Sequence, residues 1–240
     1  MTPASIPPVR LWAMPTAELT EDDVAAWLDV LDDTERSRVA RLAIPRTRIE
    51  YASAHALTRA MLSAASGEAP TAFRYEIGFK GKPRAFIGDR PLDLHFNISH
   101  TDGLVAVAVS RHCELGIDVE AVDRSVDLAV ADRYFFGAEA DWLAVQPRDR
   151  QLESFLRLWT LKEAYIKATG RGLSQPLDEF WFDVDPPRIR FTPAIDDDER
   201  AWRFHQRVLA DRFMVSAGWR SAGGVDLGLV VEMKRSAELF

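Results

Sequence analysis

The sequence is poor in cysteine, and this scarcity excludes whole classes of site. Cys113 is the only cysteine among 240 residues, so no internal disulfide can form and a cysteine-based zinc site is ruled out. A reducing cytosol is therefore the simplest location, and we expect a cytoplasmic protein. The amino-terminal stretch MTPASIPPVRLWAMP lacks the charged-then-apolar order of a signal peptide and is interrupted by prolines.

Long apolar runs and an excess of positive charge are also missing. No run approaches the roughly 20 apolar residues that span a bilayer, so we expect no membrane partner. A net charge of −7 argues against a general nucleic-acid binder, although it leaves room for a local basic pocket that holds a phosphorylated small molecule. A hydrophobic content of 47% is ordinary for a globular protein, and 240 residues suffice for one large domain or two small ones.

The periodicity of apolar residues predicts helices followed by strands, twice along the chain. The predicted helices cover residues 21–31, 33–43, 46–65, 127–135, 138–145 and 152–169. The predicted strands cover residues 73–79, 94–99, 103–110 and 115–120, and then EFWFDV, RIRF, WRFHQRVL, RFMVSAGW and VDLGLVVEM. This grouping indicates an α+β fold rather than an alternating parallel one. The polar break near 111–114 divides it into subdomains 1–111 and 112–240.

Two carboxylates lie close together on one predicted strand. Asp118 and Glu120 in GIDVE are two residues apart, so both side chains point to the same face. Neighbouring carboxylates repel one another unless a cation or a proton lies between them. An exposed strand face is the alternative interpretation of the same pattern.

A third carboxylate interrupts the apolar stripe of the predicted helix FLRLWTLKEAYIKATGRGL, residues 155–173. Glu163 precedes Lys167 by four residues. Glu–Lys ion pairs at this spacing more often lie on a solvent-exposed helix face. Carboxylates without nearby His or Cys suit Mg²⁺, which takes its remaining ligands from phosphate groups. Lys167, one helix turn beyond Glu163, could contact the phosphate that binds such an ion. Ser99 and His100 in NISHTDG end a strand where a phosphate could be held, whereas the remaining histidines, 55, 95, 112 and 205, are interpreted as structural. GxxxxGK[ST] is absent, so this is not a P-loop.

The motifs FNISHTDG, GIDVE and WTLKEAYIKATGRGL, in this order and at this spacing, resemble the signature of the Sfp-type 4′-phosphopantetheinyl transferases. The resemblance runs from about residue 33 to 184, and GKP at 81–83 and SQPL at 174–177 fit it as well. It implies a pseudo-dimeric monomer of two similar α+β subdomains with coenzyme A bound in the cleft between them. The implied reaction transfers 4′-phosphopantetheine to a serine of an apo acyl or peptidyl carrier protein and releases 3′,5′-ADP.

The resemblance also implies a role for each candidate residue. Mg²⁺ would be held by Asp118, Glu120 and Glu163 together with the pyrophosphate of the coenzyme. Glu163 would also be the base that activates the serine hydroxyl, and Lys167 would contact the pyrophosphate and assist the leaving 3′,5′-ADP. The remaining contacts to coenzyme A would come from Lys82 and Pro83 at the nucleotide end, Ser99 and His100 at the phosphates, and Arg38 at the 3′-phosphate.

The sequence departs from the family pattern at two places. Members often carry an acidic residue a few positions after a Phe-Phe pair, but RYFFGAEAD has Ala140 there and Glu139 one residue earlier, so Glu139 is not counted as a ligand. In the segment TERSRVARLAIPRTR, Arg38 fits best, and the nearby Glu50 stands where some members have a basic residue.

Two other functions are weighed against the transferase. One is a catalytically inactive module that binds a carrier protein or coenzyme A, which the three intact carboxylates and the lysine disfavour. The other is a different Mg²⁺-dependent phosphotransferase acting on free nucleotides, which the missing P-loop and kinase motifs disfavour. The choice among carriers of fatty-acid, polyketide and nonribosomal peptide synthesis stays open.

Overall fold

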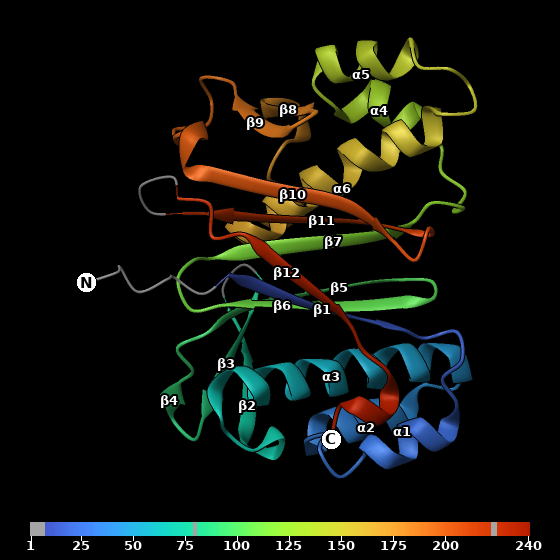
Figure 1. Ribbon diagram of the computed structural model, residues 1–240, viewed down its shortest axis with the longest axis vertical. Coiled ribbons are helices and arrows are strands. Elements are labelled where there is room, and N and C mark those ends of the chain that lie inside the picture. The colour runs from blue at the N-terminus through green and yellow to red at the C-terminus, as the bar shows by residue number, and fades with distance from the viewer. Residues whose placement is uncertain (1–7, 79–80, 222–224) are drawn as a thin grey trace. The chain divides into compact units, whose positions relative to one another are not determined.

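The computed structural model describes residues 8–78, 81–221 and 225–240, and the chain divides into two compact units (Figure 1). The first unit comprises Met1–His112 with Leu227–Phe240, and the second comprises Cys113–Asp226. The predicted subdomains 1–111 and 112–240 place the last segment in the other unit. That segment lies with the first unit because its strand β12, Leu229–Met233, pairs in parallel with β1, Val9–Pro15.

Three helices of the first unit lie where helices were predicted. They are α1 (Glu21–Trp27), α2 (Asp33–Arg41) and α3 (Pro45–Ser66). Helix α1 ends at Trp27, four residues before the predicted end at residue 31. Thr20 precedes α1, and its backbone N–H donates to the carboxylate of Asp23 at 2.8 Å. Gly67 ends α3 with a φ of 81°, in the left-handed region that glycine adopts without strain.

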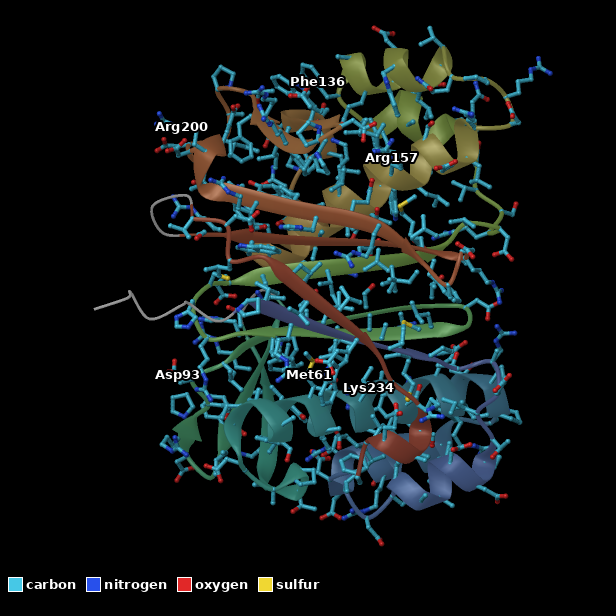
Figure 2. The ribbon with its side chains drawn as sticks, viewed as in Figure 1. Met61, Asp93, Phe136, Arg157, Arg200 and Lys234 are labelled. Carbon is cyan, nitrogen blue, oxygen red and sulfur yellow. The ribbon has the colours of Figure 1, made fainter. Side chains whose placement is uncertain are left out.

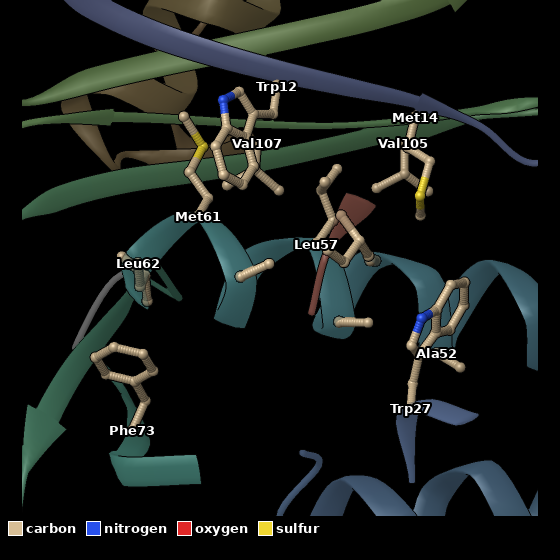
Figure 3. Close-up of a cluster of buried hydrophobic side chains, with 14 of the residues drawn as sticks. Trp12, Met14, Trp27, Ala52, Leu57, Met61, Leu62, Phe73, Val105 and Val107 are labelled. Carbon is tan, nitrogen blue, oxygen red and sulfur yellow. The ribbon is translucent and has the colours of Figure 1, made fainter. Parts of the chain in front are cut away.

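The main sheet of the first unit has the strand order β12-β1-β6-β5. β5 (His95–Thr101) and β6 (Leu104–Ser110) form the predicted antiparallel hairpin. A smaller sheet contains β2 (Phe73–Ile77), β3 (Pro83–Ile87) and β4 (Arg90–Pro91); Phe79, at the end of the predicted strand, lies outside the described residues. Helix α3 packs its apolar side chains on the main sheet, where Leu57 and Met61 belong to one buried cluster with Trp12 and Met14 (Figure 3).

The carboxyl-terminal strand β12 is fixed to the first unit by polar contacts as well as by strand pairing. The backbone N–H of Lys234 donates to the carbonyl of Ala13 at 2.8 Å, and the side chain of Lys234 is labelled in Figure 2. Glu232 accepts hydrogen bonds from Lys234 at 2.9 Å and from Arg10 at 3.0 Å. Strand β12 is therefore an edge strand of the main sheet of the first unit and lies next to β1.

The second unit contains the remaining predicted elements. Its helices are α4 (Ala129–Tyr134), α5 (Gly137–Ala144) and α6 (Gln151–Thr169). Its strands are β7 (Leu115–Ala121), β8 (Phe180–Val184), β9 (Pro187–Phe191), β10 (Trp202–Leu209) and β11 (Phe213–Arg220). Gly170, with a φ of 65°, ends α6 in the left-handed region, directly after the predicted last helical residue 169.

The two units repeat one order of elements and one strand order. Each runs from a strand through three helices and a hairpin to a second hairpin, and the first unit adds β4 and the carboxyl-terminal strand β12 to this order. In both units the first strand pairs with the final strand of that second hairpin, which gives β1-β6-β5 in the first unit and β7-β11-β10 in the second. The longest helix of each unit, α3 or α6, packs on that sheet. The predicted α+β class is therefore confirmed, and the two units share a topology.

Candidate functional site

Strand β7 presents two carboxylates on the face that carries helix α6. Asp118 lies opposite Ser216 of β11 and is buried, while Glu120 lies opposite Met214. The intervening residues Ile117 and Val119 point to the other face and are fully buried. The strand therefore separates an apolar face from an acidic one, as the alternation in GIDVE predicted.

Gly116 allows α6 to approach this strand with its backbone. A Cβ atom built on residue 116 would come within 3.0 Å of the Ala164 carbonyl oxygen and of the Ala168 nitrogen. Any side chain at this position would therefore collide with main-chain atoms of α6. The missing side chain allows the helix turn that carries Glu163 and Lys167 to lie beside the carboxylates of β7.

The charges of α6 meet those of β7 at this contact. The Lys167 ammonium lies 2.7 Å from Oδ1 of Asp118, and its side chain is 27% exposed. Burial, and then the negative charge of Asp118, raise the pKa of Glu163, while the charge of Lys167 opposes this rise. Glu120 adds a further, smaller repulsion. The four residues that the sequence singled out in this unit therefore form one electrostatic cluster.

The donor atoms of this cluster are chemically suited to bind a hard divalent cation. All three acids offer carboxylate oxygens, which Mg²⁺ prefers. A cation among them would offset the repulsion that, after burial, raises the pKa of Glu163. Within the described parts of the chain, however, no three acidic, His or Cys side chains converge as a ready-made metal site. Asp118 is instead paired with Lys167 and Glu120 with Arg124.

A buried ion pair behind the site was missed by sequence analysis. Lys162, next to Glu163, is fully buried and lies 2.7 Å from the carboxylate of Glu139. Its ammonium also donates to the carbonyls of Leu177 and Phe180, each at 2.7 Å. Burial raises the pKa of Glu139, and the adjacent ammonium opposes this rise. The signal was present, because Lys162 follows Leu158 by four residues on the apolar stripe.

The first unit contains an equivalent buried ion pair, between Glu35 and Arg59. Glu35 and Glu139 each occupy the third position of a short helix, and each accepts a bond from the backbone N–H three residues earlier. Arg59 of α3 is fully buried, donates to Glu35 at 2.8 Å, and donates to the carbonyls of Pro70 and Phe73 ahead of a hairpin. Glu139 is thus part of the buried scaffold through its ion pair with Lys162.

The acidic face, by contrast, is not repeated. The helix-facing residues of β1 include Trp12 and Met14, which pack in the apolar cluster with α3 (Figure 3). The same topology therefore forms with apolar residues on the first strand in place of the two carboxylates. The carboxylates of β7 and α6 are not required by the fold, and this favours a functional role for them.

The candidate coenzyme ligands of the first unit lie on three elements. Arg38 is exposed in the last turn of α2, Pro83 begins β3 directly after the half-buried Lys82, and Ser99 and His100 are neighbours on β5. Ser99 is buried and His100 is exposed, because successive strand residues point to opposite faces. Their joint use in binding stays a prediction.

The stretch of the chain that contains the cluster matches a known protein family. The model of the 4′-phosphopantetheinyl transferase superfamily matches residues 114–217, a stretch that contains all four site residues of the second unit. The 4′-phosphopantetheinyl transferase HetI of Nostoc sp. is 32% identical over 194 residues, which are 78% of this chain and 79% of HetI. The chain belongs to the 4′-phosphopantetheinyl transferase family.

Two further members of the 4′-phosphopantetheinyl transferase family match at higher identity over shorter stretches. The enzyme gsp of Aneurinibacillus migulanus is 44% identical over 91 residues, 38% of each chain. Sfp of Bacillus subtilis is 40% identical over 107 residues, 45% of this chain and 46% of Sfp. The chain thus spans less than half the length of these two relatives. Across the described ranges, no helix has the length and apolarity that crossing a membrane requires.

Proposed function

We propose that this protein transfers the 4′-phosphopantetheine group of coenzyme A to a serine of apo acyl or peptidyl carrier proteins and releases 3′,5′-ADP. The observation that carries the proposal is the cluster of Asp118, Glu120, Glu163 and Lys167 between β7 and α6, within the stretch that matches the family. The relatives HetI, gsp and Sfp are named as transferases, which lends no support to an inactive binding module.

The three carboxylates are proposed to hold Mg²⁺ together with oxygens of the coenzyme's pyrophosphate. The ion would offset the charge that develops on the phosphate oxygens during transfer. The oxygen-only donor set and the mutual repulsion of the carboxylates support this assignment. For the metal to be held by all three acids, Asp118 has to exchange its contact with Lys167, and Glu120 its contact with Arg124.

Glu163 and Lys167 are proposed to act on the reacting groups. The serine oxygen forms a bond to the β-phosphorus of coenzyme A, the bond from that phosphorus to the oxygen of 3′,5′-ADP breaks, and Glu163 takes the serine proton. Glu163 lies in the same cluster as the proposed metal ligands Asp118 and Glu120, so a serine hydroxyl brought to the bound phosphate would come within reach of its carboxylate. Lys167, once directed to the phosphate, stabilises the negative charge of the leaving group.

The residues of the first unit are proposed to bind the nucleotide end of coenzyme A. Lys82 and Pro83 would contact the nucleotide, Ser99 and His100 its phosphates, and Arg38 the 3′-phosphate. We further propose that the protein acts in the cytoplasm as a monomer. Its partners would be carrier proteins of fatty-acid, polyketide or nonribosomal peptide synthesis.

Mass spectrometry of carrier proteins tests the function. The protein is incubated with Mg²⁺, coenzyme A and a panel of apo carriers, and each carrier is examined for the added phosphopantetheine and the solution for 3′,5′-ADP. Modification of at least one carrier is expected. If coenzyme A binds but no carrier is modified, the inactive module is the better account; if ATP binds in calorimetry and coenzyme A does not, a nucleotide phosphotransferase is.

A further inference from the structure

Two protein cations already neutralise part of the acidic cluster. Lys167 contacts Asp118, and the guanidinium of Arg124 contacts Glu120. Among the described residues, no ion pair involves Glu163. Three carboxylates thus face two cations, and each cation lies against an oxygen donor that the proposed metal site requires.

The two partners of the Glu120–Arg124 pair differ in backbone setting and in exposure. Glu120 is part of β7, where it pairs with Met214 of the next strand, and its side chain is 12% exposed. Arg124 lies just after β7, in a turn where its N–H donates to the Ala121 carbonyl at 3.2 Å, and its side chain is 41% exposed. The carboxylate is therefore fixed by the sheet, whereas the guanidinium can swing into solvent. Part-exposed pairs of this kind contribute little to stability, so breaking the pair costs little.

We propose that Arg124 is a displaceable counterion for Glu120. Its guanidinium holds the carboxylate before a divalent cation binds, and it leaves the carboxylate when the metal takes its place. The contact keeps Glu120 from adding an uncompensated charge beside Asp118 and Glu163. It also makes Arg124 a competitor of the metal, and this inference rests on the metal site proposed above.

Removal of Arg124 should therefore tighten metal binding. Arg124→Ala leaves no guanidinium to displace, and the expected gain in affinity is about two- to fivefold, the worth of a part-exposed ion pair. Arg124→Lys keeps the positive charge but lacks the planar guanidinium group, which can donate two parallel hydrogen bonds to a carboxylate. Its affinity for the metal should therefore lie between those of the wild type and the alanine variant.

A matched control separates this competition from a general effect of charge. Arg212 is exposed to a similar extent, 43%, and its carbonyl accepts a bond from Val122 in the same turn region. Its side chain lies 3.4 Å from Asp123 rather than on Glu120. Arg212→Ala thus removes the same charge from the same end of β7 without exposing a metal ligand.

The test is a titration with Mn²⁺, used as a paramagnetic substitute for Mg²⁺, with the unbound ion measured by EPR and no coenzyme present. Circular dichroism checks that each variant is folded. Tighter binding by Arg124→Ala than by Arg212→Ala supports the proposal. Equal affinities of these two variants, or no gain for Arg124→Ala over wild type, would overturn it alone. If the wild-type protein binds Mn²⁺ only after coenzyme A is added, the same three-way comparison is made with the coenzyme present and with a protein-free blank. A wild-type protein that binds no Mn²⁺ in either condition would overturn the proposed metal site as well.

Discussion

Gly116 of β7 lies so close to the carbonyl oxygen of Ala164 that a methyl group on residue 116 would come within 3.0 Å of it. The neighbouring atoms are main-chain atoms of α6, which cannot turn aside as a side chain can. The whole helix would have to move away from the strand to make room. Because Lys167 and Glu163 belong to the same helix turn, that movement would also separate them from Asp118.

Gly116→Ala should consequently damage both stability and the site. Overpacking of a core contact costs about 1–3 kcal/mol of unfolding free energy. Chemical denaturation measures this cost, and a transfer assay at saturating coenzyme A should show a fall in kcat beyond the loss of folded protein. Gly137→Ala is the matched control, because a Cβ there meets no atom within 4 Å. Equal behaviour of the two variants would show that the close approach does not matter.

Lys162 should be essential for the fold of the second unit although it touches no reacting group. Lys162→Met leaves the Glu139 carboxylate buried without its counterion, and loss of one partner of such a pair costs about 3–5 kcal/mol. Lys162→Arg keeps the charge and reproduces the cation that the first unit uses at Arg59, so it should cost clearly less. Urea denaturation curves of the two variants give the comparison. A methionine variant as stable as wild type would contradict the assigned role.

The acid stability of the protein should depend in part on Glu232 at the carboxyl-terminal strand. Hydrogen bonds from Lys234 and then Arg10 lower the pKa of Glu232 from 4.5 to about 2. A carboxyl group with a lowered folded-state pKa stabilises the protein above the unfolded value of 4.5, and this contribution disappears as the pH falls toward 2.

Glu232→Gln should therefore destabilise the protein at neutral pH and progressively less below pH 4.5. The side chain is 35% exposed, so solvent screening limits the loss to about 1 kcal/mol or less. Thermal unfolding across this pH range measures the difference, with the exposed Glu18→Gln as a control that should show none. A difference that stays constant down to pH 2 would exclude the proposed linkage.

Most of the elements could be predicted from the sequence because their patterns are local. The GIDVE alternation placed Asp118 and Glu120 on one face, and the stripe around Glu163 placed Lys167 beside it. Strand β1 was not predicted, since nearly every residue from Val9 to Met14 is buried and the sequence VRLWAM shows no polar alternation. Its pairing with β12 joins residues more than 200 positions apart, for which no local pattern exists.

The buried ion pairs could not be predicted for a different reason. A lysine on an apolar stripe, such as Lys162, shows that a partner must exist, because a buried charge needs one. The identity of that partner depends on where α5 packs against α6, and sequence spacing carries no information about this. The contact of Arg124 with Glu120 was also missed, although the two residues are only four positions apart, because a turn rather than a helix connects them.

The rate of carrier modification by Glu163→Gln tests the central claim most directly. Glutamine keeps the size and one carbonyl oxygen but cannot take the serine proton and binds a divalent cation less well. Loss of a general base alone lowers the rate by about 10²–10⁴, and the added loss of a metal ligand should bring it to the upper end of that range or beyond. Single-turnover mass spectrometry at saturating Mg²⁺ and coenzyme A, with circular dichroism to verify folding, gives this rate. A folded Glu163→Gln variant that modifies the carrier at the wild-type rate would contradict the account.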